Sequence, residues 1–460
     1  MPTVTVIGAG LAGSEAAWQL AVRGIDVELV EMRPARMTPA HHTGLFAELV
    51  CSNSFKSSDP ATAPGMLKEE LATLGSVILA VARAHAVPAG AALAVDRERF
   101  AAAVTRIVAS HPLVRVINAE LAEVPRTGPV IVATGPLTSD ALSADLASIV
   151  GAGYLSFYDA AAPIVDATSL DMSVCFFQSR YGKGEGSDYL NCPFDAESYE
   201  RFIDALTSAR RVVRKDFEPD DLFSACQPIE EIARTGRDAL RFGPLKPVGL
   251  TDPRTGTRPW AVLQLRPENR ERTMYNLVGC QTNLAFDEQA RVFRMVPGLE
   301  SAEFLRYGVM HRNTYVDSPR VLDERLAVRM HGDVRLAGQI TGTEGYLEAA
   351  ATGLWAALVL AGELTHDAPP SSLPRETALG SLIAYATDPA TRPYQPMHVN
   401  FGLLPPLEER IKDKRARKAA FAARGRQAIA VWAHRHEALV APGLAALRTA
   451  ASTASEGSAT

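Results

Sequence analysis

Residues 4–32 read VTVIGAGLAGSEAAWQLAVRGIDVELVEM, and this stretch decides the fold class. It opens with β-branched and small apolar residues, a composition typical of a buried strand. The turn GAGLAG at 8–13 follows directly, a helical stretch then ends at Gly24, and a second apolar run contains the acidic Glu31. A strand, glycine turn, helix and strand in this order predict a βαβ unit of the Rossmann type.

The glycine turn predicts a dinucleotide site. Its glycines permit a tight turn and a close approach of the backbone to a pyrophosphate, which the N–H groups of the following helix would bind. Glu31 lies 23 residues after Gly8, a spacing at which a carboxylate accepts hydrogen bonds from a ribose. The alternative is a structural glycine turn in another α/β protein. The predicted cofactor-binding residues of this motif are Gly8, Ala9, Gly10, Leu11, Ala12, Gly13 and Glu31.

A second segment, DVRLAGQITGTEGYLEAAATGLWAALVLAGEL at 333–364, repeats the order of strand, glycine loop and helix. Such a loop would bring more backbone N–H groups to a long, extended dinucleotide, so it favours tightly held FAD over a nicotinamide cofactor that dissociates. The alternative is a plain helix start. The predicted cofactor-binding residues here are Gly338, Gln339, Thr343, Gly345 and Tyr346.

The fold class we expect is α/β: a discontinuous Rossmann-like FAD-binding domain of the glutathione-reductase type with an inserted α+β domain. Between these two motifs the sequence changes to short strands, aromatic residues and glycine-rich loops such as RYGKGEGSDY at 180–189. The expected boundaries are 1–160 for the first FAD-binding part, 161–325 for the inserted substrate- and tRNA-facing domain, 326–450 for the second FAD-binding part with C-terminal helices, and 451–460 for a flexible tail.

Composition excludes several other classes of protein. The 460 residues are 47% hydrophobic and 22% charged, which is ordinary for a globular chain. We find no run of ~18 consecutive apolar residues and no charged leader with a cleavage site, so we expect neither a membrane span nor a signal peptide. The five cysteines form no C-x-x-C and no metal-ligand cluster, which predicts reduced thiols in a cytoplasmic protein without a metal site.

The net charge of −5 does not indicate a nucleic-acid binder, but phosphate contacts are local. The run RIKDKRARKAAFAARGR at 410–426 holds eight Lys or Arg residues against one Asp. A solvated helix face explains such a run equally well. Other candidates for contact with RNA, each also explained as plain surface, are Arg210, Arg211, Arg214, Lys215 and Lys246.

Two cysteine segments carry candidate chemistry. Cys51 lies in LFAELVCSNSFKS and Cys226 precedes a Gln-Pro-Ile-Glu-Glu run. A thiol becomes a nucleophile when nearby cations or dipoles favour its thiolate. The default interpretation of any one cysteine is a small buried hydrophobe, and we keep that interpretation for Cys175 and Cys280.

At these segments the sequence resembles the folate- and FAD-dependent tRNA uracil-5-methyltransferases, the TrmFO family. The related FAD-dependent enzymes of tRNA wobble-uridine modification, the GidA type, share the amino-terminal fingerprint but not the CQPIEE and NFGLLPPL blocks. The matching blocks, spread between residues 4 and 407, are GAGLAGSEAA, HHTGLFAELVCSNSFKS, NCPF, CQPIEE, GPLKPVGL, MHRNTYVDSP, AGQITGTEGYLEAAATG and NFGLLPPL.

The resemblance implies a specific activity. The family moves a one-carbon unit from 5,10-methylenetetrahydrofolate to carbon 5 of the T-loop uridine at tRNA position 54, with reduced FAD as carrier and reductant and NAD(P)H as its source of electrons. The two cysteines of the family match Cys51 and Cys226. We expect Cys226 to add to the uracil ring and Cys51 to do acid–base work, although these roles could be exchanged. Tyr346 and His311 are candidates for stacking on folate or flavin, and the alternative for each is an ordinary buried aromatic or histidine.

Three alternatives stay open from the sequence. One is a wobble-uridine modification enzyme of the GidA type, and another is a flavin oxidoreductase that acts on a small metabolite. The third is a non-catalytic flavin-containing protein that binds tRNA, against which the two cysteine segments speak mildly.

Overall fold

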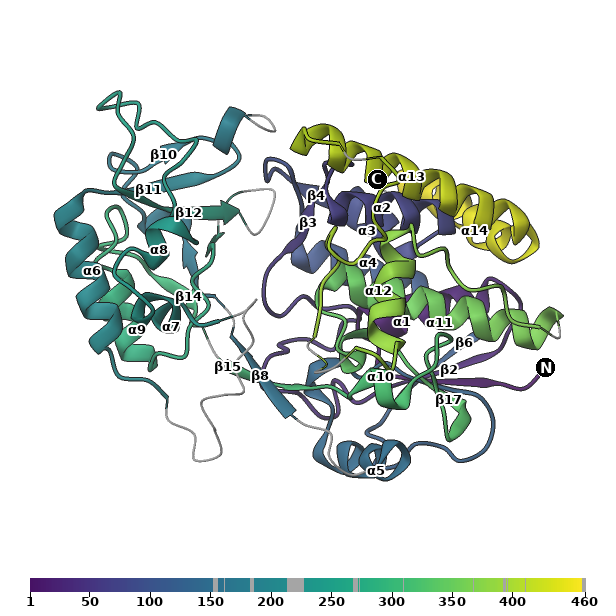
Figure 1. Ribbon diagram of the computed structural model, residues 1–460. Helices are drawn as coiled ribbons and strands as arrows, with labels where there is room; N and C mark the ends of the chain where they lie inside the picture. Colours follow the sequence, from purple (N-terminus) through teal and green to yellow (C-terminus); the bar gives the residue numbers. More distant parts are fainter. Residues whose placement is uncertain are drawn as a thin grey trace.

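A computed structural model shows two units joined side by side (Figure 1). The larger unit contains both ends of the chain and most of the helices, and the smaller unit is formed by the middle of the sequence. The structure describes residues 1–151, 156–160, 162–182, 186–212, 227–267, 272, 274–308, 310–366, 368–391, 394, 396–409 and 411–456.

The larger unit is built on a six-stranded sheet with the order β16-β17-β7-β1-β2-β6. β1 pairs in parallel with β2 on one side and β7 on the other, and β17 extends the parallel sheet beyond β7. Strands from both ends of the sequence therefore lie in one sheet, which confirms the predicted discontinuous Rossmann-like fold. The strands are β1 (Val4–Ile7), β2 (Val27–Glu31), β6 (Val114–Asn118), β7 (Val130–Val132), β16 (Ala327–Val328) and β17 (His331–Leu336).

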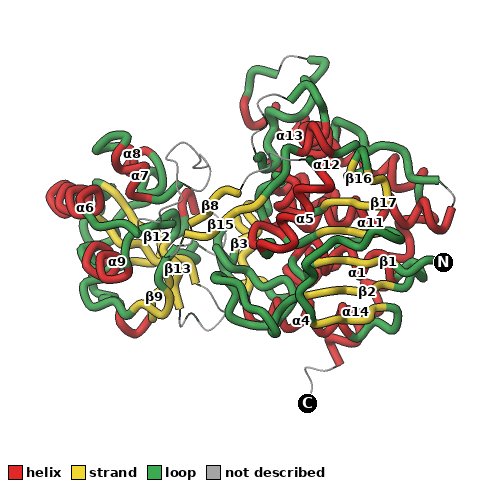
Figure 2. Tube along the Cα trace, turned by 90° about the horizontal axis from the view of Figure 1, so that it is seen from below, coloured by secondary structure: helices red, strands yellow, loops and turns green. Residues whose placement is uncertain are grey.

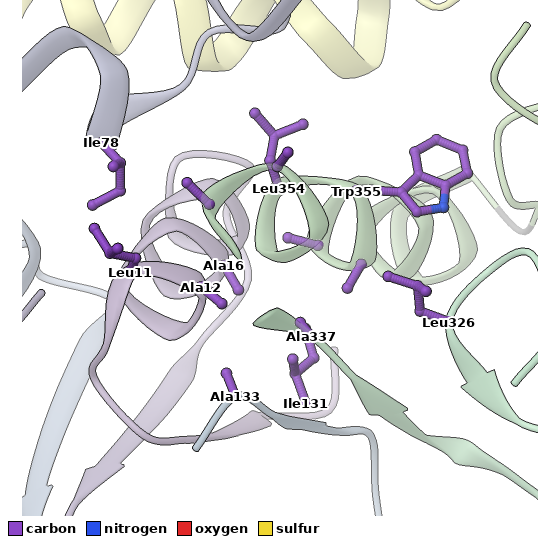
Figure 3. Close-up of a cluster of buried hydrophobic side chains, with 14 of the residues drawn as sticks. Leu11, Ala12, Ala16, Ile78, Ile131, Ala133, Leu326, Ala337, Leu354 and Trp355 are labelled. Atoms are coloured by element: carbon purple, nitrogen blue, oxygen red, sulfur yellow. The ribbon is translucent and has the colours of Figure 1, made fainter. Parts of the chain in front are cut away.

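Two helices pack closely on this sheet: α1 (Leu11–Ala21) and α11 (Tyr346–His366). Figure 3 shows the apolar side chains of these helices meeting above residues of β7 and the end of β17. The approach is so close that a Cβ added at Gly353 would lie 2.2 Å from the carbonyl oxygen of Ala12. Only glycine permits this contact without movement of the backbone.

α11 also has the length and hydropathy of a membrane-spanning helix. However, 83% of its most apolar window is buried inside the protein. The apolar character of α11 is therefore explained by its place in the core between α1 and the surrounding helices.

The remaining helices cover the sheet and extend the larger unit. A small sheet of β3 (Ser54–Ser57), β5 (Ala92–Val95) and β4 (Ala86–Val87) lies next to them. α14 continues to Glu456, so helix extends into the predicted flexible tail, and 457–460 lie outside the described residues. These helices are α2 (Ala63–Leu74), α3 (Val77–Ala84), α4 (Arg97–Ala109), α5 (Asp140–Val150), α10 (Ser318–Val321), α12 (Ala378–Thr387), α13 (Lys414–Arg435) and α14 (Glu437–Glu456).

The smaller unit is an antiparallel sheet with the order β10-β11-β12-β13-β9-β14, covered by four helices. Its core contains Cys175, Cys192 and Cys280. The strands are β9 (Ile164–Asp166), β10 (Phe176–Phe177), β11 (Leu190–Phe194), β12 (Ala261–Pro267), β13 (Met274–Leu277) and β14 (Phe304–Arg306), and the helices are α6 (Ala196–Ser208), α7 (Ile229–Arg234), α8 (Ala239–Phe242) and α9 (Phe286–Phe293).

A two-stranded ribbon, β8 (Ser156–Ala160) with β15 (Met310–Thr314), lies between the two units (Figure 2). The chain enters the smaller unit through the first strand and leaves it through the second. We therefore propose that the domain boundaries fall near this ribbon, at about the residues expected from the sequence.

The contact between α1 and α11 yields a stability prediction. Gly353→Ala should lower the free energy of unfolding by about 1–3 kcal/mol, because overpacking against Ala12 outweighs the gain of ~1 kcal/mol in helix propensity. Urea denaturation measures the difference. The control is Gly332→Ala in β17, where an added Cβ would meet no atom within 4 Å. Equal stability of the two variants would contradict the account of this packing.

Candidate functional site

A pocket lies at the carboxyl ends of β1, β2, β7 and β17, where the two glycine motifs meet. This edge of a parallel sheet is the usual place for a nucleotide in a doubly wound fold. Ala9, Gly13 and Thr343 are not part of its lining. The predicted cofactor residues that line it are Gly8, Gly10, Leu11, Ala12, Glu31, Gly338, Gln339, Gly345 and Tyr346.

The first glycine turn has the geometry needed to hold a pyrophosphate. Gly8 has a φ of +96°, and a Cβ there would lie 2.7 Å from the carbonyl oxygen of Ala133. At Gly10 a Cβ would meet nothing within 4 Å, so the backbone there is open to the pocket. Gly10 is also the N-cap of α1 and provides no side-chain cap, which leaves the first turn of the helix to a bound anion.

Glu31 is buried at the end of β2 and holds the turn from the side. Its carboxylate accepts hydrogen bonds from the Ala9 backbone N–H (2.7 Å) and from Nε of Arg33 (2.9 Å). Arg33 donates two further bonds to this carboxylate, from its backbone N–H (3.0 Å) and from Nη2 (3.3 Å). About four acceptor positions are thereby engaged, so a ribose hydroxyl would have to share or replace one of these donors. The open backbone at Gly10 and the uncapped start of α1 fit the pyrophosphate of a dinucleotide, and Glu31 fixes the turn beside them.

Sequence reasoning missed several residues of this pocket. Arg33 is only 2% exposed and pairs with both Glu31 and Glu48. The turn after β7 also lines the pocket, and its signal was visible as a buried strand running into a glycine turn. The missed lining residues include Arg33, Thr38, His41, Ala119, Thr134, Gly135, Pro136, Leu137 and Thr138.

The second glycine loop packs directly against the first motif. Gly338 has a φ of +81°, and a Cβ there would lie 2.8 Å from Cβ of Ala12. Its backbone N–H donates to the hydroxyl of Thr352 on α11 (2.8 Å), while the Thr343 hydroxyl donates to its carbonyl oxygen (3.2 Å). Thr343 therefore supports the loop from behind. The two motifs, more than 300 residues apart in sequence, form one continuous wall.

Cys51 is held next to this pocket by Tyr346, the first residue of α11. The Tyr346 hydroxyl accepts hydrogen bonds from the backbone N–H groups of Cys51 (2.8 Å) and Ser52 (3.1 Å). Burial raises the pKa of the Tyr346 phenol, which keeps the ring neutral. Arg97 and Arg306 donate to the Cys51 carbonyl oxygen at 3.1 and 3.2 Å. The structure thus brings Cys51 to the edge of the predicted cofactor site.

Cys226 lies outside the described residues, as does the His311 side chain, so the structure does not place them relative to Cys51. The residues that follow Cys226 are described. α7 begins at Ile229, and Glu230 is buried, accepting hydrogen bonds from the Thr282 hydroxyl (2.8 Å) and the Asn283 backbone N–H (2.7 Å). The CQPIEE segment is therefore held in the smaller unit from Ile229, its fourth residue, onward.

The segment around Cys51 also connects the two units. The Asn53 side-chain amide donates to the carbonyl oxygens of Val95 (3.0 Å) and Pro267 (2.9 Å), and its oxygen accepts from Nε of Arg266 (2.7 Å). Pro267 and Arg266 end β12 of the smaller unit. Asn53 is fully buried, so these bonds fix the Cys51 segment against both units.

Two lysines hold the remainder of this segment. The Lys56 ammonium pairs with the buried Glu348 carboxylate of α11 at 2.7 Å. Oε2 of Glu348 would lie 2.3 Å from a Cβ at Gly345, so the pair stands directly behind the pocket wall. Lys68 donates to the carbonyl oxygens of Phe55 (2.6 Å) and Ser57 (2.8 Å), and burial lowers the pKa of its ammonium to about 7.

Comparison with known proteins identifies the family. The family model described as "Glucose inhibited division protein A" matches residues 3–368. Among curated relatives, the methylenetetrahydrofolate–tRNA-(uracil-5-)-methyltransferase TrmFO of Heliobacterium modesticaldum is 55% identical over 93% of this chain and 97% of its own length. TrmFO of Moorella thermoacetica is 56% identical over the same shares of the two chains. The chain belongs to the TrmFO family.

Solved structures show the same architecture at lower identity. Aquifex aeolicus GidA in its form I crystal superposes with a TM-score of 0.67 at 17% identity, covering 93% of this chain and 76% of that one. At this identity the likeness shows the fold alone. The TrmFO-family chain thus has the fold of GidA, an α/β unit with a parallel Rossmann-like sheet and an inserted antiparallel sheet.

The basic candidates of this TrmFO-family chain differ in their surroundings. Arg210 pairs with Asp287 and Arg211 with Glu231, so carboxylates already neutralise both. Lys246 is exposed. Arg214, Lys215 and Arg410 lie outside the described residues. The rest of the 410–426 run forms the start of α13, whose first turn is capped by Asp413 through the Ala416 backbone N–H (2.7 Å). Among the described residues, no group of three or more His, Cys, Asp or Glu is placed to hold a metal.

The ion pair behind the pocket yields a second stability prediction. Lys56→Met leaves the Glu348 carboxylate buried without its counterion and should lower the free energy of unfolding by about 3 kcal/mol. Removal of one partner of a buried ion pair costs about 3–5 kcal/mol, and we expect the lower value here because the Lys56 side chain is 35% exposed. Replacing both residues by Met should recover most of the loss, and Lys56→Arg should keep most of the stability. If the single and double variants lose equal stability in urea, the pair is not coupled.

The lowered pKa of Lys68 predicts a pH dependence. Because the folded-state pKa of about 7 lies below the ordinary value of 10.5, the unfolded chain binds the proton more readily between these pH values. The contribution of Lys68 to stability is therefore full at high pH and is lost as the pH falls through about 7. The difference in free energy of unfolding between the wild type and Lys68→Met should increase from pH 7 to pH 10. The difference between the wild type and Lys412→Met, a change at an exposed lysine, should stay constant over the same range. A flat difference would contradict the assignment.

Proposed function

We propose that this protein methylates carbon 5 of the T-loop uridine at position 54 of tRNA. The carbon donor would be 5,10-methylenetetrahydrofolate, and NAD(P)H would supply electrons. The observation that carries the proposal is identity of 53–56% with relatives named for this reaction, over 90% or more of this chain. The pocket beside Cys51 provides the physical setting for it.

The pocket is proposed to hold FAD. Its first glycine turn and the N-terminus of α1 would bind the pyrophosphate, Glu31 the ribose, and the loop at Gly338–Gln339 the far half of the cofactor. When bound, the flavin would act as the carrier of the one-carbon unit and as its reductant. Gly345 and Tyr346 end the pocket on the side of Cys51, which supports a reacting centre at that end.

The cysteines are proposed to activate the uracil. Carbon 5 of uracil is a poor nucleophile, and addition of a thiolate to carbon 6 makes it reactive by forming an enolate. We assign this addition to Cys226. After carbon 5 has accepted the one-carbon unit, a base must remove its proton so that the thiol can leave, and we assign acid–base work to Cys51. The Cys51 backbone donates to the Tyr346 hydroxyl and accepts from Arg97 and Arg306, and these hydrogen bonds hold it in place.

The tRNA must present its uridine to this centre out of the stacked T-loop, as in other enzymes that modify a base. A tRNA substrate also favours a cytoplasmic location, in keeping with the sparse cysteines of the sequence. The wobble-uridine alternative is supported by the shared fold and by the family model, but the GidA structures are only 16–17% identical to this chain, against 53–56% for the TrmFO relatives.

The proposal predicts the cofactor and the donor. Purified protein should be yellow and should label tRNA from radiolabelled methylenetetrahydrofolate plus NAD(P)H, but not from S-adenosylmethionine. A tRNA with cytidine at position 54 is the control and should stay unlabelled. Labelling that requires only S-adenosylmethionine would overturn the proposal.

The cysteine roles are tested by substitution in the same assay. Cys226→Ala should abolish turnover because the addition to carbon 6 is lost, and Cys51→Ala should lower it strongly while FAD content stays that of the wild type. Ser58→Ala, in an exposed position of the same segment as Cys51, is the matched control and should stay active. Full activity of Cys226→Ala would remove that residue from the proposed role.

A further inference from the structure

A group of aromatic and basic side chains, exposed except for the half-buried Arg241, lies on the smaller unit, far in sequence from the glycine motifs. It consists of Arg241, Phe242, Lys246, Arg258 and Trp260, and we call it the Trp260 platform. The guanidinium carbon of Arg241 lies 3.6 Å from the centroid of the Trp260 ring and 5.8 Å from that of Phe242. Nε of Arg241 also donates to the Trp260 carbonyl oxygen (3.0 Å). Arg241 therefore lies between the two aromatic residues and links them.

Both rings of the platform are accessible. Phe242 is 78% exposed and Trp260 is 39% exposed. The exposure of Phe242 has a structural cause, because α8 ends at Phe242 while Leu240 and Leu245 on either side are fully buried. The buried leucines hold the backbone, so the ring of Phe242 is presented to solvent from a fixed position.

The chain around the platform is basic in a protein of net charge −5. Residues 234–260 contain six Lys or Arg and two Asp. Four of the six have carboxylate partners: Arg234 with Glu231, Arg237 with Glu200 and Asp204, Arg241 with Asp238, and Arg254 with Asp252. Lys246 and Arg258 are exposed, and no carboxylate of the described residues lies within ion-pair distance of either. Two exposed cations thus lie within four residues of the two exposed rings in the sequence.

This combination matches the chemistry of RNA. Unpaired bases stack on aromatic rings and on guanidinium planes, and free cations beside them bind phosphates. In the view of Figure 2, α8 of the smaller unit and α13 of the larger unit both lie toward the upper side of the molecule. α13 carries the basic run of the larger unit, so one RNA could contact both.

We propose that the Trp260 platform binds an unpaired base of the tRNA substrate, with the base stacked on Phe242 and its phosphates next to Lys246 and Arg258. This proposal rests on the proposed function for the identity of the RNA. It adds a binding surface outside the cofactor pocket. Because α8 follows α7 and packs against it, the platform would also place the RNA near the segment that contains Cys226.

Substitution of the exposed ring tests the platform. In the FAD-loaded protein, Phe242→Ala should weaken tRNA binding roughly 5- to 150-fold, the range for loss of one stacked base. KM for tRNA should rise while kcat and FAD content stay those of the wild type, and Phe242→Tyr should restore affinity. Phe286→Ala, another exposed phenylalanine (53%) of the smaller unit but on α9, is the control and should bind as the wild type does.

Charge is tested separately. Lys246→Ala should reduce by about 1 the slope of the logarithm of the tRNA binding constant against the logarithm of salt concentration.

Unchanged tRNA affinity of Phe242→Ala would overturn the proposal. A change only in the association state of that variant in analytical ultracentrifugation would also overturn it, because the ring would then serve a protein interface. If wild-type protein forms no 5-methyluridine while Phe242→Ala still loses tRNA affinity, the platform stands and the proposed function fails.

Discussion

The close contact between α1 and α11 is the constraint on which the site depends. Gly353 of α11 lies against the carbonyl oxygen of Ala12 in α1, and Gly338 before α11 lies against Cβ of the same Ala12, so neither position has room for a side chain. This contact sets the N-terminus of α1 beside the loop that precedes α11. Two motifs from opposite ends of the sequence thereby form a single pocket at the edge of the parallel sheet.

α11 then connects the pocket to the segment that contains Cys51. Its first residue, Tyr346, holds the backbone of Cys51, and Glu348 in its first turn pairs with Lys56 of the same segment. Asn53 extends the connection to Pro267 at the end of β12. Movement of the smaller unit would therefore act on the Cys51 segment, which makes the joint between the units part of the candidate site.

The sequence predicted the parts of this arrangement that depend on local patterns. The βαβ unit, the glycine loop before α11 and the insertion follow from periodicity and turn residues, and the sheet confirms them. Burial of Arg33 could not be predicted, because an arginine after a strand is usually exposed. The bond from Asn53 to Pro267 and the pair of Lys56 with Glu348 join residues more than 200 positions apart, and no local pattern encodes such contacts. Helix α14 continues to Glu456 because its alanine-rich sequence favours helix, although polar composition suggested a tail.

Analysis of modified nucleosides tests the central claim most directly. Mass spectrometry of tRNA incubated with the protein, methylenetetrahydrofolate and NAD(P)H should show 5-methyluridine at position 54, and tRNA incubated without the protein should show uridine there. Uridine that stays unmodified at position 54, together with a new modification at the wobble position, would contradict the account.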